Sequence, residues 1–225
     1  MRAAVWRRLG LHFGPGDRVL ELNCGTGADA LWLAARGVDV LATDASQGMV
    51  DVARARGVRA VQCAAEDIAA LAESRPPFDG VLSNFGGLNC VDDLSAVARS
   101  LAPAVRPGGV AVLCVMGPAV PWEWAWYLAH LQPGKAFRRF HDSTEWRGLT
   151  IRYPSARHLR VAFGPWFHTE RTWALGALVP PSYAEPLAAR FPSAVATLDR
   201  AERAVETSRL AVALADHYVV ELRRR

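Results

Sequence analysis

A short apolar run that breaks into a glycine-containing loop is the feature that most constrains the fold of this chain. Residues 19–27 read V-L-E-L-N-C-G-T-G, and an apolar pattern with helical spacing follows over residues 28–36. Backbone can approach a ligand closely only where a Cβ is absent, so Gly25 and Gly27 suit a loop that wraps a cofactor. The helix that follows would offer unpaired backbone N–H groups at its start. Because similar short patterns also form ordinary tight turns, the elements after this loop must decide between the two interpretations.

The next apolar run, residues 38–43, ends at Asp44 and predicts adenosine binding, because an acidic residue at the end of a second strand can accept both ribose hydroxyls. At this point the chain resembles the class I S-adenosylmethionine-dependent methyltransferases. Their first motif, ExGxGxG, appears here from Glu21 to Gly27, with Asn23 in place of the first glycine. Asparagine tolerates a positive φ better than most residues, so we expect the loop to keep its shape with Asn23 in that conformation.

The rest of the resemblance follows in order along the chain. A third strand is expected over residues 58–62, a fourth over 78–84, and a helix, an R-P-G-G turn and a fifth strand over 101–115. In the family an Asp after the third strand accepts from the adenine amino group, a place that Asp67 matches, although Asp67 could also cap a helix that begins near Ile68. The resemblance implies a cofactor site for S-adenosylmethionine formed by Glu21, Asn23, Gly25, Gly27, Asp44, Ala45, Met49, Glu66, Asp67, Ile68, Asn84 and Phe85.

The fold implied by the resemblance is α/β, a doubly wound seven-stranded mostly parallel sheet with an antiparallel last strand, helices on both faces and an aromatic lid inserted after strand five. A single class I methyltransferase domain would occupy residues 1–225, of which 1–115 form the cofactor-binding half, 116–154 the lid or substrate insertion, and 155–225 the closing helices and edge strands. In the last part we expect a helix over 155–164, an extended run over 167–179, a long helix over 193–215 and a last strand over 217–222. The length of 225 residues suits one domain of this size.

Composition excludes several other classes of protein. The chain has no apolar run of about eighteen residues and no secretory core near its start, so we expect a cytoplasmic protein without a membrane segment. Its four cysteines lack paired spacing, which favours reduced thiols and no metal site. Nucleic-acid binding is not favoured, because no known binding module is visible.

The segment after the fifth strand is expected to determine substrate specificity. Residues 122–132 predict a compact helix that carries Trp122 and Trp126 one turn apart, either as an aromatic wall for the acceptor or as filling for the core. From residue 135 to residue 171 eight basic side chains stand against three acidic ones. This cluster favours an anionic group on the acceptor, with Arg139 as the expected contact, or else is a solvated basic surface. The loop over residues 179–183 could form a further wall.

If the resemblance holds, the reaction is methyl transfer from a sulfonium to a small-molecule acceptor, apolar or aromatic and carrying an anionic group. No enzyme nucleophile is required, but a hydroxyl acceptor would benefit from a general base. Among His141, His168 and Tyr153 we favour His141, which is closest to the lid, over His12, His130, His158 and His217. The acceptor atom (N, O, S or C) and the oligomeric state stay open.

Two alternatives compete with this interpretation. One is a cofactor-binding or scaffold protein of the same fold that catalyses no reaction. The other is an NAD(P)-dependent oxidoreductase, because residues 25–30 formally satisfy GxGxxG/A. Against the oxidoreductase, Asp44 follows the last glycine too closely, at fewer than the ~20 residues expected for a dinucleotide site.

Overall fold

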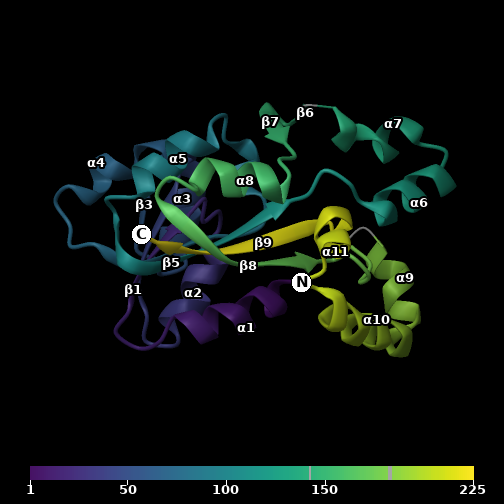
Figure 1. Cartoon of the computed structure of the whole chain (residues 1–225), viewed down its shortest axis with the longest axis horizontal. Helices are drawn as coiled ribbons and strands as arrows, with labels where there is room; N and C mark the ends of the chain where they lie inside the picture. Colours follow the sequence, from purple (N-terminus) through teal and green to yellow (C-terminus); the bar gives the residue numbers. More distant parts are fainter. Residues whose placement is uncertain (142, 182–183) are drawn as a thin grey trace.

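A seven-stranded sheet lies at the centre of the computed structural model, which describes residues 1–141, 143–181 and 184–225 (Figure 1). The strand order is β3-β2-β1-β4-β5-β9-β8. The first five strands run parallel, and β9 is antiparallel to both of its neighbours, as the sequence predicted. The strands are β1 (Arg18–Leu22), β2 (Asp39–Asp44), β3 (Ala60–Gln62), β4 (Phe78–Ser83), β5 (Val105–Met116), β8 (Phe167–Leu175) and β9 (His217–Arg224).

Helices cover both faces of the sheet, and successive strand residues point alternately into two apolar cores. In β4, for example, Val81 packs in one core and Leu82 in the other. Figure 1 shows α1 and α2 on one side of the sheet and α5 and α8 on the other. One core contains residues of α1 (Arg2–His12), α2 (Ala28–Ala34) and α3 (Gln47–Ala55), and the other contains residues of α4 (Ile68–Ala72), α5 (Leu94–Leu101) and α8 (Ala156–Phe163).

The insertion after β5 forms more elements than the single helix that was expected. Helix α6 (Pro121–Ala129) ends earlier than predicted, and α7 (Pro133–Ala136) and the 3₁₀ turn η3 (Arg138–Phe140) follow it. A separate hairpin of β6 (Ser143–Trp146) and β7 (Leu149–Arg152) then leads back to α8. Its two-residue turn has positive φ at both positions, which is the geometry that suits a tight hairpin. Figure 1 shows this insertion at one end of the molecule, away from the first three strands.

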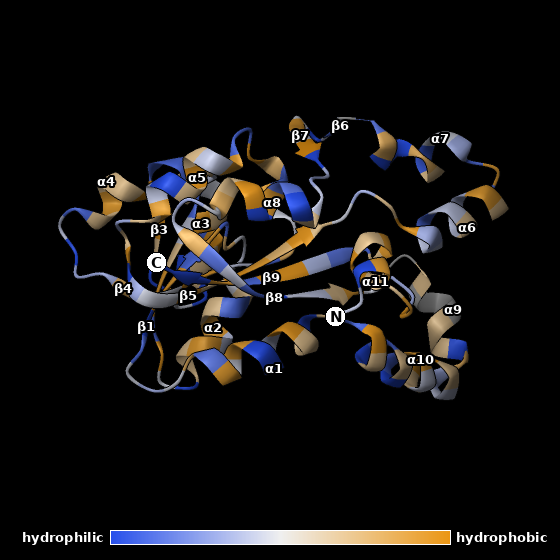
Figure 2. Cartoon of the chain, viewed as in Figure 1, coloured by the Kyte–Doolittle hydropathy of each residue, from blue (hydrophilic) through white to orange (hydrophobic). Residues whose placement is uncertain are grey.

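The predicted long helix over residues 193–215 is wrong in one respect, because the structure divides it into α10 (Pro192–Val205) and α11 (Arg209–Leu214), which follow the short α9 (Glu185–Arg190). Two hydrogen bonds are made at the break between α10 and α11. The backbone N–H of Ala174 donates to the carbonyl of Glu206 (2.7 Å), and the hydroxyl of Ser208 accepts from Ala211 at the start of α11 (3.1 Å). Figure 2 shows apolar and polar residues mixed along α10, as expected for a helix with one covered face. Among the described residues, no helix has the length and apolar character needed to cross a membrane.

Candidate cofactor and acceptor site

The loop between β1 and α2 has the backbone geometry of a ligand cradle. Asn23 has a φ of 53°, which confirms the conformation expected for it in place of glycine, and Gly25 and Gly27 have φ values of 53° and 74°. A Cβ built on Gly27 would lie 2.7 Å from a methyl carbon of Val58, so that glycine is needed for packing. A Cβ built on Gly25 would meet no atom within 4 Å. The loop is therefore closed against the protein at Gly27 and faces open space at Gly25.

Asp44, at the end of β2, is fixed beside this loop by two backbone hydrogen bonds. Its Oδ2 accepts from the N–H of Gly25 and its Oδ1 accepts from the N–H of Ser46, both at 2.9 Å. Each carboxylate oxygen retains capacity to accept a further bond. Ala45 and Met49 lie next to it and are exposed. The sheet therefore brings the predicted ribose acceptor against the glycine loop.

The predicted adenine-binding residues follow β3, in the turn η1 (Ala65–Asp67) and the start of α4. Asp67 is exposed and occupies the cap position of α4, but its side chain accepts no hydrogen bond from that helix. The capping role considered for Asp67 is therefore not realised. Ile68 is buried, so only its backbone could face a ligand, while Glu66 is half-buried. A role for these residues in adenine binding stays a prediction.

Two buried carboxylates, Glu21 (1% exposed) and Asp29 (4% exposed), lie where β1 and α2 meet. Asp29 is paired with Arg2, and it also accepts from the indole of Trp6 (2.6 Å) and the amide of Asn84 (3.1 Å). Burial, with the nearby Asp29 charge as the second cause, raises the pKa of Glu21 well above its usual range. Arg2, Trp6 and Asp29 were not predicted from the sequence, although an acidic residue in the first turn of the helix after the loop was a visible signal for Asp29.

The same region contains two buried oxygen acceptors that have no hydrogen-bond partner among the described residues. They are Oε2 of Glu21 and Oδ1 of Asn84, at the ends of the neighbouring strands β1 and β4. Leaving such atoms unpaired is costly, so their presence indicates a ligand that donates hydrogen bonds, such as an ammonium group. Phe85 follows Asn84 with a φ of 52°, a conformation that is rare for a bulky residue and that concentrates at functional sites.

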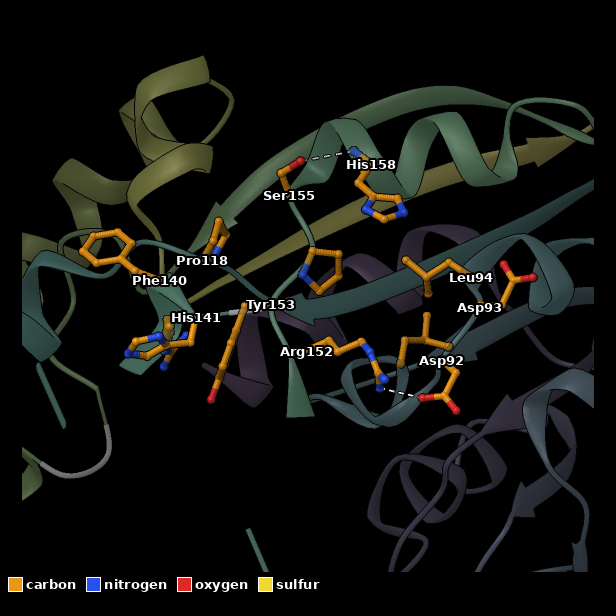
Figure 3. Close-up of a pocket in the computed structure, with 13 residues that line it drawn as sticks. Asp92, Asp93, Leu94, Pro118, Phe140, His141, Arg152, Tyr153, Ser155 and His158 are labelled. Atoms are coloured by element: carbon orange, nitrogen blue, oxygen red, sulfur yellow. Dashed lines mark hydrogen bonds and ion pairs between the residues drawn. The ribbon is translucent and has the colours of Figure 1, made fainter. Parts of the chain in front are cut away.

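A cavity of about 460 Å³ lies beyond this region, beside the insertion (Figure 3). The short turn η2 (Gly87–Cys90) connects it to the cofactor loop. A Cβ on Gly87 would lie 2.2 Å from Cβ of Asn23, so the two loops are in contact, and the next residue, Leu88, lines the cavity. On the side of the insertion, the cavity is lined by residues that include Phe140, His141, Arg152 and Tyr153.

The two tryptophans predicted as an aromatic wall for the acceptor lie away from this cavity. The indole of Trp122 donates to the carbonyl of Leu178 (3.1 Å), and the ring of Trp126 lies 4.5 Å from that of His130. Neither tryptophan lines the cavity. The insertion instead contributes the rings of Phe140 and Tyr153, because the unpredicted elements η3 and β7 bring these two residues there.

Arg139 was expected to contact an anionic acceptor, but its contacts are internal. It is only 7% exposed and pairs with Glu123 and Asp216, both at 2.6 Å. Its Nη1 also donates to the carbonyl of Gly117 (3.0 Å). Arg152, the other arginine of the cavity, pairs with Asp92 at 2.6 Å. The geometry therefore argues against Arg139 as an anion contact, while an anionic group on the acceptor stays a prediction.

The favoured general base, His141, is exposed and lies beside Phe140 at the edge of the cavity (Figure 3). Its role stays a prediction. Tyr153 also lines the cavity, and its hydroxyl is 3.0 Å from Oγ1 of Thr144. His168, the third candidate, lies near the start of β8, which is the end of the sheet away from the cofactor loop. The structure therefore brings two of the three candidates to the cavity.

The chain matches known proteins mainly over its first half. A methyltransferase-domain model matches residues 19–109. The chain is 40% identical over 112 residues to a demethylmenaquinone methyltransferase of Mycobacterium sp. (strain KMS), which covers 48% of this chain and 47% of that protein. The corresponding protein of Clavibacter sepedonicus is 37% identical over 109 residues, which covers 47% of this chain and 44% of that protein. The chain thus spans about half the length of the curated relatives it matches.

Solved structures share the whole fold at lower identity. An S-adenosylmethionine-dependent methyltransferase from Mesorhizobium loti has a TM-score of 0.62 at 20% identity and 98% coverage of both chains. A putative S-adenosylmethionine-dependent methyltransferase from Listeria monocytogenes has a TM-score of 0.64 at 14% identity and 100% coverage of both chains. The strand order, the cofactor loop and these matches agree with one another. The chain has the fold of the class I S-adenosylmethionine-dependent methyltransferases, and residues 19–109 match a methyltransferase domain.

Proposed function

We propose that this protein binds S-adenosylmethionine and transfers its methyl group to a small-molecule acceptor. The observation that carries the proposal is the cradle at the ends of β1 and β2, where Gly25 faces open space beside the fixed carboxylate of Asp44. In this assignment Asp44 would hold the ribose hydroxyls. The unpartnered oxygens of Glu21 and Asn84 would accept from the ammonium group of the cofactor.

When bound, the cofactor supplies the activated methyl group on its sulfonium. The residues of the chain position the two reactants and exclude water, which is the main contribution expected of a protein in such a displacement. Met49, Glu66, Asp67 and the backbone of Ile68 would surround the adenosine portion. Asn84 and Phe85 would lie at the methionine end, nearest the acceptor.

The cavity of about 460 Å³ is the place we assign to the acceptor, since Gly87 and Leu88 connect it to the cofactor loop. Its size suits a small molecule. The rings of Phe140 and Tyr153 favour an apolar or aromatic acceptor, whereas the paired state of Arg139 and Arg152 offers no free guanidinium to an anion. Demethylmenaquinone, named for the relatives, is one acceptor worth testing. A cytoplasmic location remains the expectation from the sequence.

Isothermal titration calorimetry with S-adenosylmethionine, its demethylated product and NAD tests the cofactor assignment. We expect the first two to bind and NAD not to bind. An acceptor panel of phenols, naphthols, thiols, amines and demethylmenaquinone, assayed for the demethylated cofactor, then tests catalysis. Binding of NAD alone would favour the oxidoreductase alternative. Cofactor binding without turnover of any acceptor would favour the non-catalytic one.

A further inference from the structure

The last strand brings a histidine to the same edge of the sheet as the cofactor loop. Because β9 runs antiparallel to β5, its first residue, His217, is paired with Met116 at the carboxyl end of β5 and with Leu175 at the end of β8. His217 is 8% exposed. A buried imidazole at the ligand-binding edge of a doubly wound sheet needs a structural or a chemical reason, and its hydrogen bonds distinguish the two.

One nitrogen of the His217 ring is held and the other is free. Nδ1 lies 3.0 Å from Oδ2 of Asp216, whose Oδ1 accepts from Nη2 of Arg139 at 2.6 Å. Burial alone would raise the pKa of Asp216, but the interactions with His217 and then with Arg139 lower it to about 2. Asp216 is therefore a carboxylate and accepts the hydrogen of Nδ1, which leaves the lone pair on Nε2. Nε2 has no hydrogen-bond partner among the described residues.

The ring of His217 packs against the residue that follows the cofactor-binding end of β4. Its centroid lies 5.3 Å from that of Phe85, edge to face. Phe85 in turn lines a second cavity, of about 380 Å³, together with Arg2 and residues 179–181. On the other side, Arg139 lines the cavity assigned to the acceptor and holds Asp216. His217 thus contacts Phe85 at the methionine end of the cofactor site and is linked through Asp216 and Arg139 to the acceptor side of the insertion, although it does not itself line either cavity.

We propose that His217 is the general base for a hydroxyl acceptor and that Asp216 is the residue that positions it; this inference rests on the proposed function. As the acceptor oxygen forms its bond to the methyl carbon, the carbon–sulfur bond breaks and its electron pair stays on sulfur. The hydroxyl proton passes to Nε2 of His217 and is later released to solvent. His141, in contrast, is exposed.

The test compares variants that distinguish the role of Nδ1 from the role of Nε2 in His217. His217→Asn retains a donor toward Asp216 and lacks Nε2, whereas Asp216→Asn keeps the imidazole and removes the carboxylate that orients it. His168→Gln is the matched control, because that histidine is exposed on β8 at the far end of the sheet. Circular dichroism establishes that each variant is folded, and calorimetry measures its affinity for S-adenosylmethionine.

Turnover is measured with two probes, 1-naphthol, which keeps its proton at neutral pH, and 4-nitrothiophenol, which is already ionised there. For His217→Asn we expect a loss of about 100-fold or more with 1-naphthol and of less than about tenfold with 4-nitrothiophenol, because only the first needs a base. Cofactor affinity should stay within about threefold of the wild type, since general-base catalysis does not contribute to cofactor binding. The control should behave as the wild type.

Nitrogen-15 NMR of the His217 ring supplies a readout that does not depend on activity. We expect the tautomer with hydrogen on Nδ1 in the wild type and a mixture of tautomers in Asp216→Asn. Equal losses with both probes, hydrogen on Nε2 in the neutral wild-type ring, or a wild type that methylates only the ionised probe would overturn the assignment of His217. Failure of the wild type to bind S-adenosylmethionine would instead overturn the proposed function.

Discussion

Replacement of Arg139 by glutamine should destabilise the fold, because this arginine neutralises two buried carboxylates. Glu123 is fully buried and Asp216 is 5% exposed, and both lie 2.6 Å from the guanidinium. Removing one partner of a buried ion pair typically costs about 3–5 kcal/mol, because a charge is left without compensation. The lowering of the Asp216 pKa from 3.8 to about 2, which His217 and Arg139 produce together, corresponds to about 2 kcal/mol. We therefore expect the free energy of unfolding to fall by about 3 kcal/mol.

Urea denaturation of the wild type and Arg139→Gln at neutral pH measures this loss, with Arg138→Gln as the control. Arg138 also contacts Glu123, but its side chain is 38% exposed, so its removal should cost less than about 1 kcal/mol. The pH dependence has a definite sign. The pKa of Asp216 is depressed in the folded state, so its contribution is present above the unfolded value of 3.8 and is lost as the pH falls through about 2. The difference between Arg139→Gln and the wild type should accordingly shrink over that range.

Equal small losses for the two arginine variants would contradict this account. So would a fully stable Arg139→Gln protein that binds cofactor normally but has a raised acceptor KM. That second result would restore Arg139 as an acceptor contact, as the sequence suggested, and would mean that Glu123 and Asp216 find other partners.

Three further predictions concern the cofactor site. Asp44→Ala should weaken S-adenosylmethionine binding in calorimetry by at least about tenfold, because charge-assisted hydrogen bonds are worth about 1.5–3 kcal/mol each, and unchanged affinity would contradict the ribose assignment. Asn23→Gly should bind cofactor as the wild type does, whereas Asn23→Val should bind it more weakly, since a φ of 53° costs a β-branched residue at least about 1–2 kcal/mol. Equal affinities of the two variants for the cofactor would show that the loop does not need this conformation. The raised pKa of Glu21 predicts that a bound ammonium group drives proton release, so affinity should increase with pH up to that pKa. Calorimetry in buffers of different ionisation enthalpy measures the release, and Glu21→Gln should abolish it.

The cofactor half could be predicted from the sequence because its determinants are local. Glu21, Asn23 and Gly25 lie within one strand and one turn, and Asp44 ends the next strand. The positive φ of Asn23 follows from the residue type alone once the loop is recognised. The strand order then follows from how such units pack, with parallel strands buried on both faces. Each inference needed only residues close together along the chain.

The insertion could not be predicted in the same way, because its partners come from distant parts of the chain. Arg139 pairs with Asp216, 77 positions away, and the indole of Trp122 donates to Leu178, 56 positions away. Neither contact can be predicted from the spacing or the periodicity of residues along the sequence. The helical pattern over residues 122–132 did identify α6, but not the positive φ of Leu131 that helps to end it.

The basic cluster over residues 135–171 shows why a local count of charge cannot identify which arginines are paired. Counted within that segment, the arginines appear unpaired. In the structure Arg139, Arg152 and Arg171 contact carboxylates that lie outside it, respectively on α6 and before β9, before α5, and after α10. The net charge of a segment of sequence predicts the electrostatic field around it only if the compensating charges lie in the same segment. An anion site should therefore be inferred from guanidinium groups without partners, and counting cannot identify these.

The position of His217 follows from the direction of its strand. In parallel strands the ligand-binding edge lies at the carboxyl end, so residues such as Asp44 and Asn84 are sought after the last apolar residue. An antiparallel strand at the end of such a sheet begins at that same edge. Its first residue, here His217, therefore lies at that edge, paired with Met116 at the end of β5. Because the family resemblance predicts an antiparallel last strand, the direction of that strand is sufficient to place the histidine at its start at the ligand-binding edge, which is the basis for proposing His217 beside His141.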